Sequence, residues 1–299
     1  MKKVLVTGGS GFIGRRLALL KPDWIYVSSA DYSLDSYEDT RLMYRDVRPD
    51  AVIHLASLVG GIRANKNNPV VFFEKNILIN LNVIRCAFEH KIKRVLASLS
   101  TCIFPDTLSH YPFNESNIFE GSPSETNLSY AMSKRALYVH CNAYRKKFNL
   151  NYSTFSPSNV YGPGDHFLDP DSHFIAALVR KLSHAKQGDE IEMWGTGNPL
   201  RQQLYVDDLV QILPKLLISH NNETPLIISP DENLSIKEMC EIGNKISQKD
   251  VRFKFSGGLD GQFRKDGSNA LLKDLIGNFK FTTFEEGFRK TYNHYNDLR

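Results

Sequence analysis

Tyr130 and Lys134 are four residues apart in the segment SYAMSKRA. On a helix, positions i and i+4 share one face, so the phenol and the ammonium would point the same way. A nearby ammonium lowers the pKa of a phenol, which is about 10 when unperturbed. Such a phenol could exchange a proton with a carbonyl or alcohol during hydride transfer. The same spacing also occurs on ordinary surface helices, but a glycine-rich segment upstream and Ser100 between the two favour the chemical interpretation.

The glycine-rich segment TGGSGFIG lies at the N-terminus and has the spacing G-x-x-G-x-x-G. It follows an apolar stretch typical of a strand and opens a helical pattern. Glycines permit a tight turn there, and the backbone amides can approach a pyrophosphate at the helix N-terminus. A plain turn between strand and helix is the alternative, but the context favours a dinucleotide. The residues expected to contact it are Gly8, Gly11, Phe12, Ile13, Gly14 and Arg15, together with Leu55, Ala56 and Ser57 at the end of a central strand.

The end of the second strand bears on the choice of dinucleotide. NAD sites often place an acid there to hold the ribose hydroxyls. This chain has Ser28, Ser29 and Ala30 instead, with Asp31 just beyond. The absence of an immediate acid favours NADP, and Arg15 or Arg16 is a candidate for a 2′-phosphate.

Three further residues could take part in the chemistry. Ser100 follows a strand and could hydrogen-bond a substrate carbonyl at the carboxyl edge of the sheet. Cys102 is in the same loop, where a nearby cation would favour its thiolate; a packed small hydrophobe is the alternative. His173 begins a later helix and could serve as a general acid, although a surface histidine at a helix start is common.

Apolar strands alternate with helical patterns in the first half of the chain. This order predicts an α/β fold with a Rossmann-type, doubly wound parallel sheet. We expect an NADP-binding domain over 1–162, to which 203–228 return, and a smaller α/β substrate domain formed by 163–202 and 229–299. The expected strands are 3–6, 24–27, 51–56, 94–99, 152–156 and 190–194, and the expected helices begin at 14, 69, 172 and 235 and near 130 and 284.

The composition is ordinary for a soluble globular protein. The chain has 299 residues, of which 41% are hydrophobic and 23% charged, and a net charge of +4. That excess suits an anionic nucleotide and is too dispersed to indicate nucleic acid. No stretch approaches the roughly 18 apolar residues of a membrane span, and no signal peptide is evident. The four cysteines form no C-x-x-C pair, so we expect neither disulfides nor a metal site, and a cytoplasmic location.

Nearly end to end, the chain resembles the GDP-L-fucose synthases, a family of extended short-chain dehydrogenases/reductases. The Val-Gly-Gly-Ile stretch with Asn65 and the S-x-C-I-F-P loop are more specific than the generic reductase signature. The matching segments are VTGGSGFIG, HLASLVGGIRAN, LSTCIFPD, YAMSKRA, SNVYGPGDHF, WGTGNPLRQ and DGQFRK.

The resemblance implies an NADPH-dependent enzyme that acts on GDP-4-keto-6-deoxy-D-mannose by 3,5-epimerisation and then reduction at C4. It assigns the reductase triad to Ser100, Tyr130 and Lys134, the epimerisation base to Cys102 and the acid to His173. It places Asp35 at adenine and Asn159 at the substrate or the nicotinamide ribose. It implies a GDP-sugar site at Asn159, His173, Lys181, Trp194, Arg201 and Lys265.

Three alternatives to this function remain open from the sequence. The sugar could carry another nucleotide, such as UDP. The enzyme could be a plain 4-reductase in which Cys102 is structural. A non-catalytic NADP-binding regulator is a third, although such proteins usually lose the tyrosine or lysine of the pair. The resemblance also implies a homodimer joined through helices at about 72–90 and 130–148.

Overall fold

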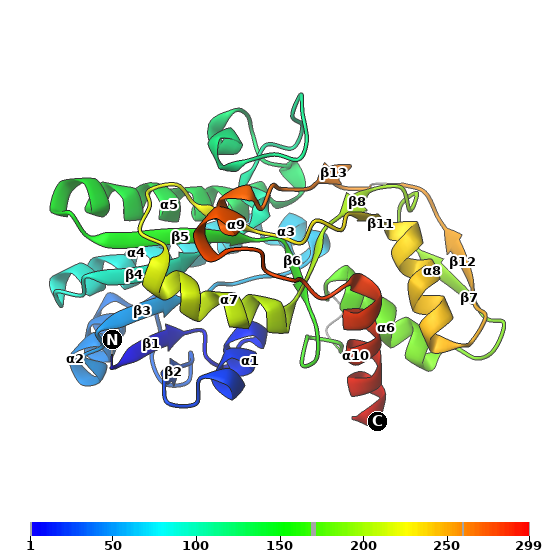
Figure 1. Ribbon diagram of the computed structural model, residues 1–299, viewed down its shortest axis with the longest axis horizontal. Coiled ribbons are helices and arrows are strands. Elements are labelled where there is room, and N and C mark those ends of the chain that lie inside the picture. The colour runs from blue at the N-terminus through cyan, green and yellow to red at the C-terminus, as the bar shows by residue number, and fades with distance from the viewer. Residues whose placement is uncertain (1, 169–171, 259, 299) are drawn as a thin grey trace.

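A six-stranded parallel sheet forms the centre of the computed structural model, which describes residues 2–168, 172–258 and 260–298 (Figure 1). Its strands are nearly continuous apolar runs, as expected for a sheet covered on both faces. The spatial order is β2 (Ile25–Val27), β1 (Val4–Thr7), β3 (Ala51–His54), β4 (Arg94–Ser98), β5 (Asn151–Pro157) and β10 (Leu226–Ile228), written from one edge to the other.

Helices cover both faces of this sheet. One core joins it to α2 (Tyr37–Val47), α4 (Pro69–Glu89) and α5 (Leu128–Phe148). A second core, on the other face, contains residues of α1 (Phe12–Leu20), α7 (Val206–Ser219) and α9 (Ala270–Ile276). The doubly wound α/β fold predicted from the sequence is thus confirmed.

The strand order reverses between β1 and β3, which pair in parallel with Thr7 opposite His54. In open α/β sheets, ligands bind at the carboxyl ends of the strands on either side of such a reversal. The connections that leave these ends include the short α3 (Ile62–Asn67) and three 3₁₀ turns, η1 (Thr101–Ile103), η2 (Glu115–Phe119) and η3 (Glu125–Asn127). The candidate site is built from these connections.

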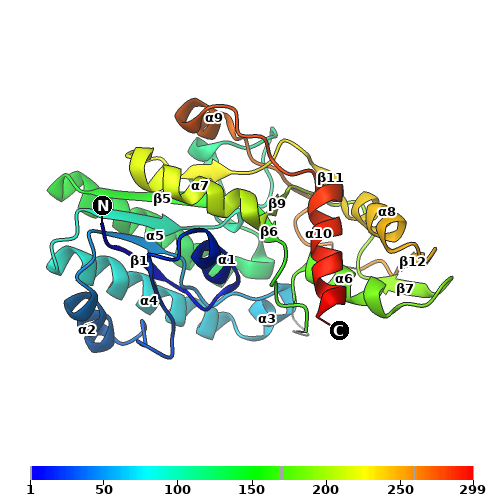
Figure 2. The ribbon, with the colours of Figure 1, turned by 60° about the horizontal axis from the view of Figure 1, so that its bottom comes forward.

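A smaller part lies beside the carboxyl edge of the sheet (Figure 2). Its core holds α6 (Phe174–His184), α8 (Ile236–Ser247) and α10 (Phe284–Asp297). Three small sheets accompany these helices. They are β6 (Asn159–Tyr161) with β9 (Gln203–Tyr205), β7 (Glu190–Met193) with β12 (Arg252–Phe255), and β8 (Leu200–Arg201) between β11 (Leu234–Ser235) and β13 (Arg264–Lys265).

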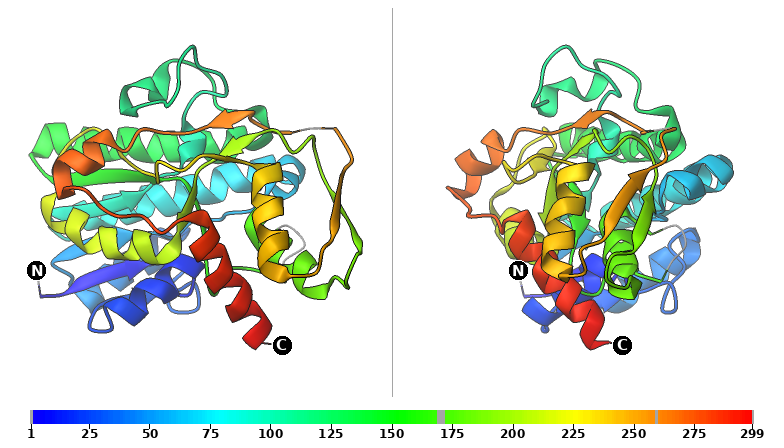
Figure 3. Two further views of the ribbon diagram at one scale, coloured as in Figure 1. Left: turned by 45° about the vertical axis from the view of Figure 1, so that its right-hand side comes forward. Right: turned by 90° about the vertical axis from the view of Figure 1, so that its right-hand side faces the viewer.

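The division expected from the sequence differs from the packing in two places. The strands β6 and β9 were expected in the NADP-binding domain, but Tyr161 and Tyr205 are buried in the core of the smaller part. We expected 229–299 to belong to the smaller domain, but α9 packs against α7 and β10 of the large layer. The chain leaves β12, crosses through β13 and reaches α9, so one segment spans both parts (Figure 3). Its apolar residue Leu272 is buried in the core of the large layer, which explains why it returns there.

Candidate active site

The turn after β1 is shaped by glycines that no other residue could replace without displacing backbone. Gly8 has a φ of +76°, and a Cβ there would lie 2.8 Å from the backbone nitrogen of Ala56. A Cβ on Gly14 would collide with the carbonyl oxygen of Gly8. The amide of Gly11 donates to that same oxygen at 3.0 Å, which closes the turn. The turn therefore brings the start of α1 close to the end of β3.

The N-terminus of α1 suits a pyrophosphate. Gly11 occupies the N-cap position without a side-chain cap, and the first turn carries no acidic residue. The free amides and the helix dipole favour an anion there. Arg15 lies one turn further on and donates to the carbonyl oxygens of Ser10 and Gly164. This end of the helix thus fits the phosphates of the dinucleotide that the glycine pattern predicts.

Near the end of β2, where the adenine ribose is expected, the acidic side chains are engaged by neighbouring residues. The carboxylate of Asp31 accepts from the backbone amide and the hydroxyl of Ser28, both at 2.8 Å. Asp35 accepts from Ser33 and pairs with Lys75 at 3.5 Å. Arg16, one of the two arginines considered for a 2′-phosphate, forms an ion pair with Asp207 instead.

A buried series of hydrogen-bonded side chains lies beneath the expected cofactor position. The hydroxyl of Thr7 lies 2.7 Å from Nδ1 of His54, and Nε2 of His54 lies 3.0 Å from the amide oxygen of Asn80. Burial, followed by the nearby charge of Lys134, lowers the pKa of His54 to about 3. The imidazole is therefore neutral near pH 7 and holds β1, β3 and α4 together.

Tyr130 and Lys134 both lie on α5, as their spacing predicted. Ser57 and Ser100 lie close enough to the hydroxyl of Tyr130 for their hydroxyls to lower its pKa. The ammonium of Lys134 donates to the carbonyl oxygen of Ser98 at 2.9 Å and lies 5.8 Å from the centroid of the Tyr130 ring. The structure thus gathers Ser100, Tyr130 and Lys134 at the end of β4.

The expectation that Lys134 lowers the pKa of Tyr130 is wrong for this structure. Burial, the largest effect, and the nearby charge of Cys102 raise the pKa of Tyr130 above its ordinary value, against the smaller, lowering effect of Ser57 and Ser100. Burial also lowers the pKa of Lys134, to about 7. The spacing in sequence predicted the shared face but not this dry environment.

Cys102 lies in η1, which Ser100 caps by accepting the amide of Cys102 at 3.2 Å. Its sulfur accepts from the side-chain amide of Asn127 and from the ammonium of Lys265, each at 3.0 Å. Burial raises the pKa of Cys102, but Lys265, Ser100 and Arg201 outweigh it, so the pKa falls below the ordinary value. The other three cysteines are buried; burial is the main cause that raises the pKa of each.

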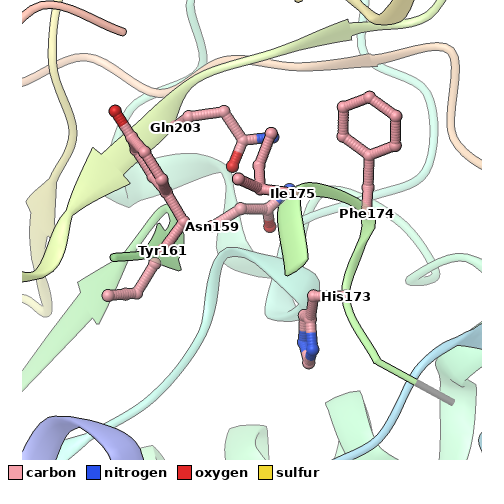
Figure 4. Close-up of a pocket in the computed structure, with 7 residues that line it drawn as sticks. Asn159, Tyr161, His173, Phe174, Ile175 and Gln203 are labelled. Atoms are coloured by element: carbon pink, nitrogen blue, oxygen red, sulfur yellow. The ribbon is translucent and has the colours of Figure 1, made fainter. Parts of the chain in front are cut away.

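His173 and Asn159 line a small cavity between β6, β9 and the start of α6 (Figure 4). Gln203 contributes its side chain from β9. His173 is the exposed N-cap residue of α6. Burial, the largest effect, raises the pKa of the Asp165 carboxyl group, and the nearby charge of His173 acts in the opposite direction.

The remaining expected substrate residues line the smaller part. Arg201 donates to the carbonyl oxygen of Leu200 at 2.7 Å, and burial lowers its pKa. Lys181 donates to the carbonyl oxygen of Glu192, beside Trp194. Trp194 is 72% exposed, which leaves its ring available for stacking.

Sequence reasoning missed two residues of the site. Asn127 precedes α5 and reaches Cys102, while Gln262 donates to the carbonyl oxygens of Pro105 and Asp106 at 3.0 and 3.1 Å. Asn127 stands three residues before Tyr130, but nothing in its local pattern marks it. Gln262 falls in the segment DGQFRK, whose match to the resembled family was the one available signal.

The fold and this arrangement define a nucleotide-dependent sugar epimerase, dehydratase or reductase. The chain belongs to the NAD dependent epimerase/dehydratase family, whose model matches residues 4–228. Within it, the chain is a member of the GDP-L-fucose synthases. It is 34% identical to GDP-L-fucose synthase of Dictyostelium discoideum, over 97% of this chain and 94% of the relative.

Further relatives agree. A probable GDP-L-fucose synthase of Drosophila melanogaster is 33% identical, over 99% of this chain and 97% of the relative. The crystal structure of a GDP-L-fucose synthetase from Naegleria fowleri bound to NADP superposes with a TM-score of 0.90 at 30% identity, covering 99% of this chain and 93% of that one. The resemblance inferred from the sequence is confirmed.

Proposed function

We infer that this protein is an NADP-dependent GDP-L-fucose synthase. It converts GDP-4-keto-6-deoxy-D-mannose to GDP-L-fucose by epimerisation at C3 and C5 and reduction at C4. One observation carries the inference beyond kinship. The sulfur of Cys102 accepts two N–H hydrogen bonds and lies close enough to Tyr130 for its charge to raise the pKa of that phenol. A base for epimerisation and an acid for reduction therefore share one site.

In the epimerisation, the C4 ketone acidifies the protons on C3 and C5. The Cys102 thiolate removes each proton, and the electron pair moves to the C4 oxygen. Ser100 and Tyr130 stabilise that oxyanion by hydrogen bonds. His173 returns a proton to the opposite face of the carbon, which inverts the centre.

In the reduction, the hydroxyl of Tyr130 donates a proton to the C4 oxygen while Ser100 holds that oxygen in place. When bound, NADPH supplies the hydride. The Gly8–Gly14 turn, the uncapped start of α1 and Arg15 would hold its phosphates. Arg201 suits the substrate diphosphate because its guanidinium can bind two oxygens at once.

A homodimer is supported by the exposed face of α4 and α5, two helices that pack against each other. This face carries Leu78 and Leu81 on α4 and Met132 and Val139 on α5, all between 40% and 53% exposed. A second copy would bury these side chains in a four-helix contact.

We also propose a cytoplasmic location, in keeping with the free cysteines. Within the described residues, no helix has the length and apolar character needed to cross a membrane.

The decisive experiment follows NADPH oxidation with GDP-4-keto-6-deoxy-D-mannose in deuterated buffer and NMR of the product. We expect GDP-L-fucose with deuterium at C3 and C5. An unlabelled, uninverted sugar would make the protein a plain 4-reductase. Turnover only with UDP- or dTDP-linked ketosugars would reassign the nucleotide, and no turnover with any of them would favour a binding role.

A further inference from the structure

The last third of the chain contributes directly to the state of Cys102. We propose that Lys265 and Asn127 are positioning residues that keep Cys102 as a thiolate, so that this base is active only while the segment 262–268 lies on the Cys102 loop. This inference rests on the proposed function, in which Cys102 removes protons from the substrate. It assigns to Lys265 a role other than contact with the diphosphate.

The first support is the chemistry of the groups around the sulfur. Lys265 approaches Sγ with an ammonium, which has three donors and no acceptor, and Asn127 approaches with its NH₂ group. Neither group can accept an S–H proton, whereas both can donate to S⁻. A neutral thiol would leave these donors poorly satisfied, so the arrangement favours the anion.

The second support is the register of the small sheet. Strands β13 and β8 are parallel, and Lys265 lies directly opposite Arg201. Side chains in register on neighbouring parallel strands leave the same face of a sheet. Among the described residues, the charged and titratable groups that face Cys102 are Lys265 and Arg201 from this sheet and Tyr130 from α5. Two of the three are cations, which lower the pKa of a thiol.

The third support is the attachment of this sheet to the Cys102 loop. Gln262 is buried and donates to two carbonyl oxygens just beyond η1, those of Pro105 and Asp106. Further along, the backbone amide of Phe113 donates to the backbone carbonyl oxygen of Asp266 at 2.9 Å, and the amide of Ser268 donates to the carbonyl oxygen of Phe113 at 2.7 Å. These bonds fix the strand that carries Lys265 against the loop that carries Cys102.

The position of Lys265 beside Cys102 is compatible with the proton transfers of the epimerisation. In each epimerisation the C–H bond breaks, an S–H bond forms on Cys102, and the carbon's electron pair passes to the C4 oxygen. His173 gives its proton to the carbon as the electron pair returns from the C4 oxygen; Cys102 then releases its own proton to solvent, and His173 takes one up from solvent. Lys265 favours that release, which readies the thiolate for the second carbon.

The test is the pH dependence of Cys102 alkylation by iodoacetamide in the full chain without substrate. The other cysteines are buried, and a Cys102→Ser variant gives the background. We expect wild-type reactivity to rise with a midpoint below the usual value of about 8.5. Lys265→Met should raise that midpoint by about one pH unit, which slows alkylation at pH 7 about tenfold. Lys265→Arg should restore most of the shift.

Two more variants separate the effect of Lys265 on Cys102 from a general change of charge. Arg264→Gln removes a cation from the same strand, but Arg264 pairs with Asp266 rather than with Cys102, so its midpoint should match wild type. Asn127→Ala removes the second donor without altering the 262–268 segment and should raise the midpoint by a smaller amount. If Lys265→Met and Asn127→Ala both titrate like wild type, the proposal is wrong.

Substrate deuteration gives a second readout. The rate of deuterium exchange at C3 and C5 should fall about tenfold at pH 7 in Lys265→Met and recover as the pH rises toward 9, because the thiolate then forms unaided. A loss that appears only as a higher KM and shows no recovery with pH would assign Lys265 to the diphosphate instead. Absence of exchange in the wild type would overturn the proposed function, while the alkylation midpoints would still decide the role of Lys265.

Discussion

The ammonium of Lys134 donates to the carbonyl oxygen of Ser98, 2.9 Å away, at the end of the strand that leads to Ser100. It therefore joins α5 to β4 directly beneath the reacting groups. Lys134 is buried, and burial lowers its pKa to about 7. A lysine with this pKa changes charge near neutrality, which has a consequence for stability that can be measured.

The stability of the fold should depend on pH through Lys134. The pKa of lysine in the unfolded chain is about 10.4, so between about pH 7 and 10 the unfolded state binds the extra proton. Unfolding free energy should therefore rise with pH in the wild type relative to Lys134→Met, by up to about 1.4 kcal/mol per pH unit. Below about pH 7 the difference between the two should be constant.

Urea denaturation from pH 6 to 10 measures this difference. Lys147→Met, which removes an exposed lysine from the same helix, serves as the control, and the difference between its unfolding free energy and that of the wild type should not change with pH. A wild-type curve parallel to that of Lys134→Met throughout would mean that Lys134 stays charged in the folded protein.

Reduction should depend on the hydroxyl of Tyr130. Tyr130→Phe keeps the ring but removes the proton that the C4 oxygen needs, so kcat for NADPH oxidation should fall by about 100-fold or more. Deuterium exchange at C3 and C5 should persist at a reduced rate, because Ser100 still stabilises the oxyanion. Tyr138→Phe, on the same helix, should leave both rates unchanged. Equal loss of exchange and reduction would show that Tyr130 serves mainly the enolate.

Local patterns in the sequence were sufficient for five of the six strands of the central sheet and for the nucleotide turn, whereas β10 was not among the expected strands. The strands are short apolar runs, and the glycines of the first turn are required by backbone approach at Gly8 and Gly14. The pair Tyr130 and Lys134 needed only the helical period. By contrast, β8 and β13 have two residues each, and so short a strand leaves no periodic signal.

The surroundings of Cys102 could not be predicted in this way. Lys265 is 163 residues away in the chain and meets the sulfur only because the segment after β12 crosses back over the large layer. The pKa values of Tyr130 and Lys134 also depend on burial by distant elements, so spacing alone gave the wrong sign for the tyrosine.

Cofactor affinity should be improvable at the end of β2. Ala30 is exposed there, and the nearby carboxylate of Asp31 is turned back onto Ser28. Ala30→Lys would add a cation beside the position expected for the ribose, which should lower KM for NADPH by about fivefold at low salt and leave KM for NADH unchanged. Ala30→Met, of similar length without charge, is the control. An equal gain for both cofactors would place the 2′-phosphate elsewhere.

The exposed face of α4 and α5 should control assembly. Leu81 is 41% exposed on α4, and a glutamate there would bring two buried charges together across a symmetric contact. We expect Leu81→Glu to convert a dimer to a monomer in sedimentation-velocity experiments at micromolar concentration. Leu19 is 74% exposed on α1, on the opposite face of the sheet, so Leu19→Glu should sediment like wild type. Circular dichroism of both variants tests whether the fold is retained. A folded Leu81→Glu protein that remains dimeric would move the interface away from α4, and a monomeric wild type would exclude the homodimer.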